Sequence, residues 1–226
     1  MFVFNERHTP KEPESRETCF ASSVIWPSCS VAVSPGQLNR STSTVMEVRE
    51  LDWPNDRAAV LALDTGYVTN RRLRLELTAR SAALVEEVLS VPLRGEFDLV
   101  DVVDKLTDYA WVRIAGEGVE VLGLAALSLE NWNRRARLEH LYVAKRARGK
   151  GVGRALVEAA FQAAGSLGVR GVLVETQPTN YGAVRFYERL GFRWCGLDSS
   201  LYDPQTVAAG EVGIFFWKEL NETSAR

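Results

Sequence analysis

The spacing of apolar and polar residues changes along the chain, and it predicts where strands and helices lie. In Arg71–Ala79 every second residue is apolar, with Leu73, Leu75 and Leu77 on one face, as in a half-buried strand. Leu84–Leu89 is its expected hairpin partner. The other elements expected before residue 144 are strands at Val45–Leu51, Tyr109–Ala115, Val119–Leu129 and Ala136–Val143, and helices at Ala58–Leu63 and Phe97–Leu106.

In the second half of the chain, Gly151–Leu167 predicts an amphipathic helix. Its expected buried face holds Val152, Ala155, Leu156, Ala159, Ala163 and Leu167, and its exposed face holds Arg154, Glu158, Gln162 and Ser166. A second helix is expected through Ala183–Leu190, with strands at Val172–Val174, Phe192–Leu197 and Gly213–Lys218. Mostly antiparallel strands followed by a strand–helix–strand–helix unit predict one mixed α/β domain (α+β) over residues 44–226.

Composition narrows the class of protein. The 226 residues are 46% hydrophobic, enough for one buried core. Residues 1–43 show no sustained helical or strand periodicity and are expected to form a loosely ordered extension. A net charge of −2 argues against a partner that is nucleic acid or an anionic membrane, and no apolar run is long enough to span a bilayer. Cys19, Cys29 and Cys195 lack CxxC spacing, so we expect no metal site and a cytoplasmic protein. A homodimer is compatible with these features.

The strongest chemical signal lies at the start of the amphipathic helix. In Arg146–Gly153, basic residues at 146, 148 and 150 alternate with small ones, and glycines stand at 149, 151 and 153. Glycines let an anion approach the unpaired amides and positive dipole end of the helix. The segment therefore predicts a phosphate-binding turn.

Two common phosphate-binding loops fit this segment less well. A Walker A loop needs Ser or Thr after its Gly-Lys pair, but Gly151 follows Lys150. A dinucleotide-binding turn needs an acidic residue about twenty positions later, in a βαβ unit. Glu175 is loosely placed for that role, but the basic residues and the preceding antiparallel strands fit poorly.

The segment Arg148-Gly149-Lys150-Gly151-Val152-Gly153 resembles the pyrophosphate loop of the Gcn5-related N-acetyltransferases (GNAT). That family's second signature follows at the expected distance, as Asn180, Ala183, Phe186-Tyr187 and Gly191-Phe192. The resemblance spans about residues 45–220 in its order of elements. It implies a mostly antiparallel mixed sheet flanked by helices, with splayed central strands, and acetyl-CoA (coenzyme A) as cofactor.

A narrower resemblance is to the streptothricin acetyltransferases, carried by Asn131–Arg135, Leu173–Thr176 and Cys195–Asp203. Those enzymes inactivate the antibiotic by acetylating an amine of its β-lysine moiety. The resemblance implies a small cationic amine substrate and antibiotic resistance. The side chains that would line the substrate site are aromatic or acidic: Trp132, Glu139, Glu175, Asp198, Tyr202 and Asp203.

The GNAT resemblance also implies how the cofactor lies. Its pantetheine arm would pair with the backbone of Leu141, Tyr142 and Val143, and Asn180 would lie near that arm. Packing of Leu141 and Val143 into the core does not conflict with this role, because backbone groups do the binding. The pyrophosphate would be held by Arg148, Gly149, Lys150, Gly151, Val152, Gly153 and Arg154.

Acetyl transfer requires an uncharged amine, although a lysine-type amine has a pKa of about 10. A carboxylate that takes its proton solves this problem, and Glu139 is the first candidate, with Glu175 second. The family's second signature places Tyr187 where it can protonate the leaving thiolate. In an alternating strand, residues 139 and 140 point to opposite faces, so His140 is expected to pack rather than to contact substrate.

Other functions remain open at this point. An acetyltransferase for protein N-termini or lysines would share the cofactor loop but present a peptide groove. A non-catalytic acetyl-CoA sensor belongs to a different class of protein, yet both Tyr187 and the loop glycines are present. A nucleotide-binding regulator fits the motifs least well.

Overall fold

The computed structural model describes residues 46–203, 205 and 211–220. Short 3₁₀ turns, η1 (Leu106–Asp108), η2 (Asn131–Asn133) and η3 (Lys145–Ala147), join some of the elements. The helices are α1 (Arg57–Leu61), α2 (Val100–Val103), α3 (Val152–Ser166) and α4 (Tyr181–Arg189). The strands are β1 (Glu47–Glu50), β2 (Tyr67–Leu77), β3 (Ala82–Gly95), β4 (Trp111–Glu117), β5 (Glu120–Glu130), β6 (Arg135–Val143), β7 (Gly171–Thr176), β8 (Arg193–Asp198) and β9 (Gly213–Glu219).

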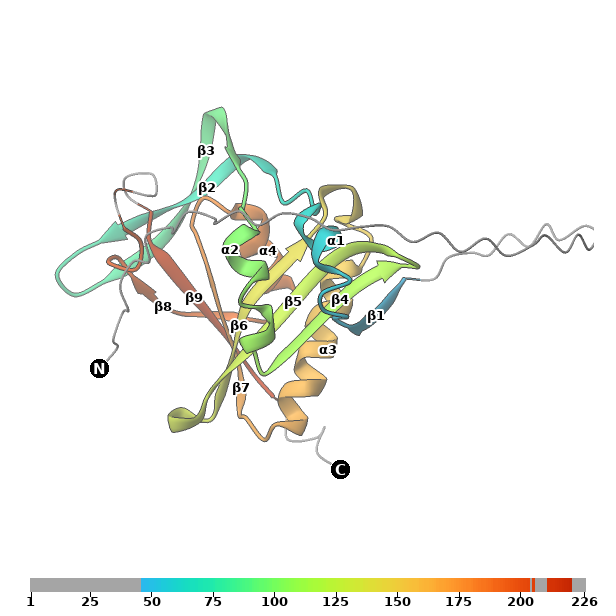
Figure 1. Ribbon diagram of the computed structural model, residues 1–226. Helices are drawn as coiled ribbons and strands as arrows, with labels where there is room; N and C mark the ends of the chain where they lie inside the picture. Colours follow the sequence, from blue (N-terminus) through green and yellow to red (C-terminus); the bar gives the residue numbers. More distant parts are fainter. Residues whose placement is uncertain (1–45, 204, 206–210, 221–226) are drawn as a thin grey trace, which may run out of the picture. The chain divides into compact units, whose positions relative to one another are not determined.

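Seven of these strands form one sheet in the order β1-β4-β5-β6-β7-β9-β8, and β2 and β3 form a separate hairpin (Figure 1). β6 and β7 are parallel, whereas the other neighbouring pairs are antiparallel. This arrangement confirms the mixed, mostly antiparallel α+β fold that the sequence predicts.

Helices cover both faces of the large sheet (Figure 1). Gly123 of β5 faces α3, since a Cβ atom there would lie 2.9 Å from Leu156. The next residue, Leu124, is fully buried on the opposite face, where α1 packs against β5 and α2. α4 lies beside α3, because a Cβ atom on Gly153 would lie 3.2 Å from the Phe186 ring.

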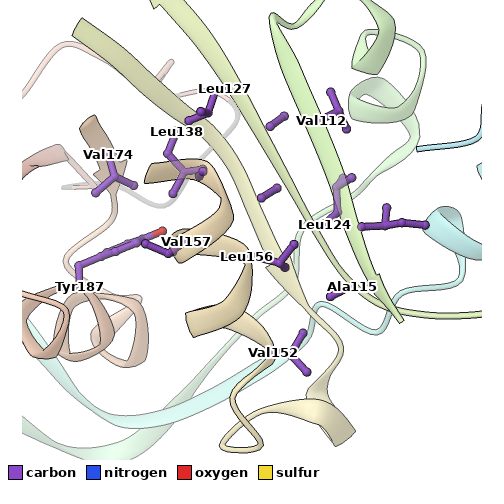
Figure 2. Packing of buried hydrophobic residues seen from close by; sticks show 14 of the residues in the cluster. Val112, Ala115, Leu124, Leu127, Leu138, Val152, Leu156, Val157, Val174 and Tyr187 are labelled. Atoms are coloured by element: carbon purple, nitrogen blue, oxygen red, sulfur yellow. The ribbon is translucent and has the colours of Figure 1, made fainter. Parts of the chain in front are cut away.

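Apolar side chains between α3, α4 and the sheet form the part of the core next to the site. Leu156 and Val157 of α3 are buried, as are Leu127 and Leu138 of the sheet (Figure 2). Tyr187 of α4 packs its ring into the same cluster. The start of α3 and the middle of α4 are therefore fixed by the burial of apolar surface.

The two parallel strands separate part of the way along their length. Ala136–Leu138 pairs with Val172–Val174, but no described residue of β7 pairs with residues 139–143 of β6. β6 remains paired with β5 on its other side as far as Val143. The splay expected of the central strands is present, and it leaves one backbone edge of β6 open beside the start of α3.

The β2–β3 hairpin is held against this opening. Its two ends are joined through Thr65, whose buried hydroxyl donates to the carbonyl of Phe97 (2.8 Å) and accepts from the Phe97 amide (2.9 Å). The Leu73 amide donates to the Pro178 carbonyl (3.0 Å), and the Tyr181 hydroxyl donates to Glu86 (2.9 Å). These bonds anchor the hairpin to α4 and to the loop before it.

Some details of the structure depart from the sequence-based expectations. The helix expected over Phe97–Leu106 is only the four residues of α2, followed by η1. Leu167, expected on the buried face of α3, is 43% exposed, and the expected alanines are half-buried. They flank the buried stripe, which consists of Val152, Leu156, Val157, Ala160 and Ala164.

The extension expected over residues 1–43 lies outside the described residues, as does Val45. Within residues 46–203, 205 and 211–220, no helix has the length and apolar character needed to cross a membrane.

Candidate functional site

A cavity of about 550 Å³ opens at the splay between β6 and β7. Its walls come from the free edge of β6, the turn before α3, the first turns of α4 and the base of the β2–β3 hairpin. Leu141, Tyr142 and Val143, which are expected to pair with the pantetheine arm, line it together with Asn180 and Tyr187. The cavity has the size of an ordinary small-molecule site.

The turn that leads into α3 closes one end of the cavity. Gly149 and Gly153 line it, and Gly149 and Gly151 have φ angles of +77° and +92°, which favour glycine. Gly151 is the N-cap of α3, so the amides of residues 152 to 154 have no acceptor within the helix. Val152, at the first helical position, is buried and anchors the turn to the core. This geometry fits an anion such as a diphosphate.

Arg148 has a structural role that the sequence did not reveal. Its guanidinium donates to three backbone carbonyls: Val143 (3.0 Å), Gly66 (2.8 Å) and Thr65 (2.9 Å). Burial lowers the pKa of this guanidinium. Arg148 therefore joins the end of β6 to the segment before β2 while it lines the cavity.

The remaining predicted cofactor residues lie at the N-terminal ends of α3 and α4. Asn180 is the N-cap of α4, and its side chain accepts from the Ala183 amide at 3.3 Å. Lys150 is exposed, and Arg154 is exposed and forms an ion pair with Glu158 (3.7 Å). Lys150 directly precedes Gly151, and Arg154 follows it by three residues in the first turn of α3. They can therefore add positive potential at this end of the cavity.

A β-bulge changes the direction of side chains in β6. Ala126 of β5 pairs with His140 and Leu127 with Leu138, so no described residue of β5 pairs with Glu139. Glu139 accepts from the Ser128 hydroxyl (2.6 Å), and Ser128 shares a face of β5 with Ala126. Glu139 and His140 therefore point to the same face, and the expectation of opposite faces was wrong because the bulge interrupts the alternation.

Two carboxylates meet on this face at the splay. Glu139 is held by Ser128 and by an ion pair with Arg137 (3.2 Å). Glu175, at the end of β7, accepts from the Tyr202 hydroxyl. Burial raises the pKa of Glu175, an effect opposed by the Tyr202 hydrogen bond and by the charge of Arg137. The charge of Glu139 raises it further, which places the two acids within each other's field.

Tyr187 reaches the cavity from the middle of α4. It is buried, and its ring packs between Phe186, Phe192 and Phe216. Burial raises its pKa well above the usual range, and the negative charge of Glu175 adds to the effect. The phenol therefore keeps its proton over the physiological pH range and can act only as a donor or as an uncharged acceptor there.

None of the six predicted substrate residues is among the described residues that line the cavity, although Glu175 lies close enough to Tyr187 and Tyr142, which do line it, to raise their pKa values. Trp132 is 83% exposed in the turn between β5 and β6, at the opposite end of β6 from Val143. Asp198 accepts from the amide and the hydroxyl of Ser200, and Asp203 accepts from the Gln205 amide. Both aspartates thus stabilise turns after β8.

The residues at the base of the hairpin were not predicted from the sequence. Thr65, Tyr67 and Phe97 line the cavity, the Tyr67 and Phe97 rings stack at 6.0 Å, and Phe97 lies 5.7 Å from the ring of Tyr142. These residues belong to neither signature. The available signal was two aromatic residues at the ends of a long strand pair, which is too general to identify a site.

Comparisons with known proteins agree with this geometry. Residues 84–192 match the Acetyltransferase (GNAT) family model. Streptothricin acetyltransferase of Streptomyces lavendulae is 32% identical over 170 residues, covering 72% of this chain and 89% of the relative.

Two solved structures share the fold over nearly their whole length. Nourseothricin acetyltransferase is 31% identical with a TM-score of 0.70, covering 78% of this chain and 99% of that one. A Bacillus anthracis protein assigned as a streptothricin acetyltransferase, in complex with acetyl coenzyme A, is 27% identical with a TM-score of 0.65. The match covers 79% of this chain and 99% of that one. The chain therefore belongs to the GNAT family and is an acetyl-CoA-dependent acetyltransferase.

Proposed function

We propose that the protein transfers the acetyl group of acetyl-CoA to the β-lysine amine of streptothricin and so confers resistance to this antibiotic. The observation that carries the proposal is the pair of carboxylates, Glu139 and Glu175, on one face beside the cofactor cavity. A polycationic amine gains charge-assisted hydrogen bonds at such a site. The similarity to named streptothricin and nourseothricin acetyltransferases supports the same substrate.

In this proposal the cofactor is held by the turn Arg148–Gly153, Arg154 and the open edge of β6 at Leu141–Val143, with Asn180 beside its arm. When bound, acetyl-CoA supplies the activated acetyl group. The amides at the start of α3 bind its diphosphate, because they are unpaired within the helix and lie at the positive end of its dipole.

The two carboxylates have different roles toward the amine: one accepts its proton and the other binds the cation. The raised pKa of Glu175 brings it closer to the pH at which a proton acceptor works best. Arg137 and Ser128 hold Glu139 in place, which suits binding of the cation. Proton acceptance by Glu175, with Glu139 as the alternative base, reverses the order that the sequence suggested. Tyr187, uncharged and at the cavity wall, donates the proton to the leaving thiolate.

The other proposed substrate contacts are Tyr202, Asp198, Asp203 and Trp132. Tyr202, hydrogen-bonded to Glu175, can pack against the antibiotic's rings. Asp198 and Asp203 would add negative charge in the turn after β8. Trp132 could contact only a part of the substrate that extends along β6 toward its first residue.

The test is an assay of coenzyme A thiol release with purified protein, acetyl-CoA and a panel of amines. The panel contains streptothricin, spermidine and a lysine-containing peptide at equal concentrations. We expect kcat/KM for streptothricin to exceed that for the other amines by at least about tenfold, since each well-placed charge-assisted hydrogen bond contributes about 1.5–3 kcal/mol. Preference for the peptide would instead identify a protein acetyltransferase. Bound acetyl-CoA without turnover of any amine would identify a sensor.

A further inference from the structure

His140 is a half-buried titratable residue to which the proposed mechanism gives no role. Its Nε2 lies 2.8 Å from the hydroxyl of Tyr109, and its Nδ1 lies 3.4 Å from the hydroxyl of Tyr142. The imidazole stacks on the Tyr142 ring, with centroids 5.7 Å apart and planes at 21°. His140 and Tyr142 share a face of β6 by the ordinary alternation of the strand, and the bulge brings Glu139 to that face as well.

The imidazole of His140 is uncharged over the physiological pH range. Burial, together with the positive charge of Lys105, lowers its pKa to about 4. A neutral imidazole has one N–H donor and one acceptor nitrogen. The two tyrosine hydroxyls must therefore play opposite roles, one donating to His140 and the other accepting from it.

Tyr142 connects this cluster to the cavity. Its ring lines the cavity and lies against Phe97, whereas Tyr109 is not among the described residues that line it. Burial, followed by the fields of Tyr109 and Glu175, raises the pKa of Tyr142 to about 12. Tyr142 in turn helps to raise the pKa of Tyr187. The hydroxyl that His140 holds therefore lies within the field of both proposed reacting groups.

We propose that His140 is a positioning residue for acetyl transfer, which bridges Tyr109 and Tyr142 and so fixes the Tyr142 side chain beside Glu175 and Tyr187. When Tyr109 donates to Nε2, Nδ1–H donates to the Tyr142 oxygen. The proton of Tyr142 is then available to a partner other than His140. The proposal rests on the acetyltransferase activity and not on the identity of the amine.

The test is a double-mutant cycle in kcat with His140→Phe and Tyr142→Phe. It uses the panel amine that the unaltered protein acetylates fastest, so a wrong substrate assignment does not affect it. Phenylalanine keeps a ring at position 140 but removes both hydrogen bonds. We expect kcat of H140F to fall about tenfold while KM for acetyl-CoA changes less than twofold. The double variant should be no slower than the slower single variant, because both remove the same interaction.

Two further variants separate positioning from packing. His140→Gln keeps a donor and an acceptor, so it should recover most of the lost kcat. Tyr109→Phe removes a hydroxyl that lies outside the cavity wall, and it should lower kcat about threefold or more even if H140F does not fold. Unchanged kcat in Y109F would overturn the proposal. The proposal would also be overturned if the losses in kcat of H140F and Y142F multiplied in the double variant. The same holds if H140F had a lower unfolding temperature but an unchanged kcat.

Discussion

Replacement of Gly151 by valine is expected to weaken acetyl-CoA binding by at least tenfold. Gly151 has a φ of +92°, where a non-glycine residue is strained by about 1–3 kcal/mol and a β-branched residue more than most. Relief of that strain moves the amides at the start of α3. Each hydrogen bond to a charged group contributes about 1.5–3 kcal/mol, so the loss of one accounts for the effect. Isothermal titration of acetyl-CoA measures it.

The matched control is Gly165→Ala in the last turn of the same helix. A Cβ atom at Gly165 meets nothing within 4 Å, and its φ is not in the positive range. Alanine there should raise the free energy of unfolding by about 0.5–1 kcal/mol and leave acetyl-CoA affinity unchanged. Equal affinities of G151V and the unaltered protein would show that the helix start does not hold the cofactor.

Tyr187→Phe is expected to lower kcat by about 10²-fold or more, the range of a general acid. Removing only the hydroxyl keeps the ring packing with Phe192 and Phe216, so the unfolding temperature should change little. Because the pKa of Tyr187 is raised by burial, the unaltered enzyme should lose no activity through ionisation of this group between pH 7 and about 9. Steady-state kinetics across this pH range measure the fall in kcat and the pH dependence, and thermal unfolding measures stability.

Glu188→Gln provides the control on the adjacent, exposed face of α4. Glu188 forms an ion pair with Arg185 at 2.8 Å, and it is not among the described cavity residues. An exposed pair of this kind contributes little to stability, so both kcat and stability should stay close to those of the unaltered protein. A kcat of Y187F within threefold of the parent value would remove Tyr187 from the mechanism.

The parts of the structure that the sequence predicted best depend on local chemistry. The turn before α3 has positive φ angles at residues 149 and 151, which glycine adopts readily. The apolar residues of α3 and α4 repeat at helical spacing. Asn180, the first residue of the second signature, is the N-cap of α4, three residues before the helical spacing that begins at Ala183. Each of these features is set by residues within one or two turns of one another.

The parts that could not be predicted depend on contacts between distant segments. The bulge at Glu139 exists only in the register of β6 against β5, so regular strand alternation wrongly placed Glu139 and His140 on opposite faces. Thr65 and Phe97 meet because a long hairpin returns to its starting point. Arg148 carries charge, as the motif suggests, but its bonds to Thr65 and Gly66 required the position of the hairpin.

The most direct test of the central claim compares acetyl-CoA with S-acetylpantetheine in calorimetric titrations of the unaltered protein. The second compound keeps the acetyl thioester and the pantetheine arm but lacks the diphosphate and the nucleotide. If the open start of α3 holds the diphosphate, acetyl-CoA should bind at least about a hundredfold more tightly, a difference of about 2.7 kcal/mol. Equal affinities for the two compounds would contradict the account.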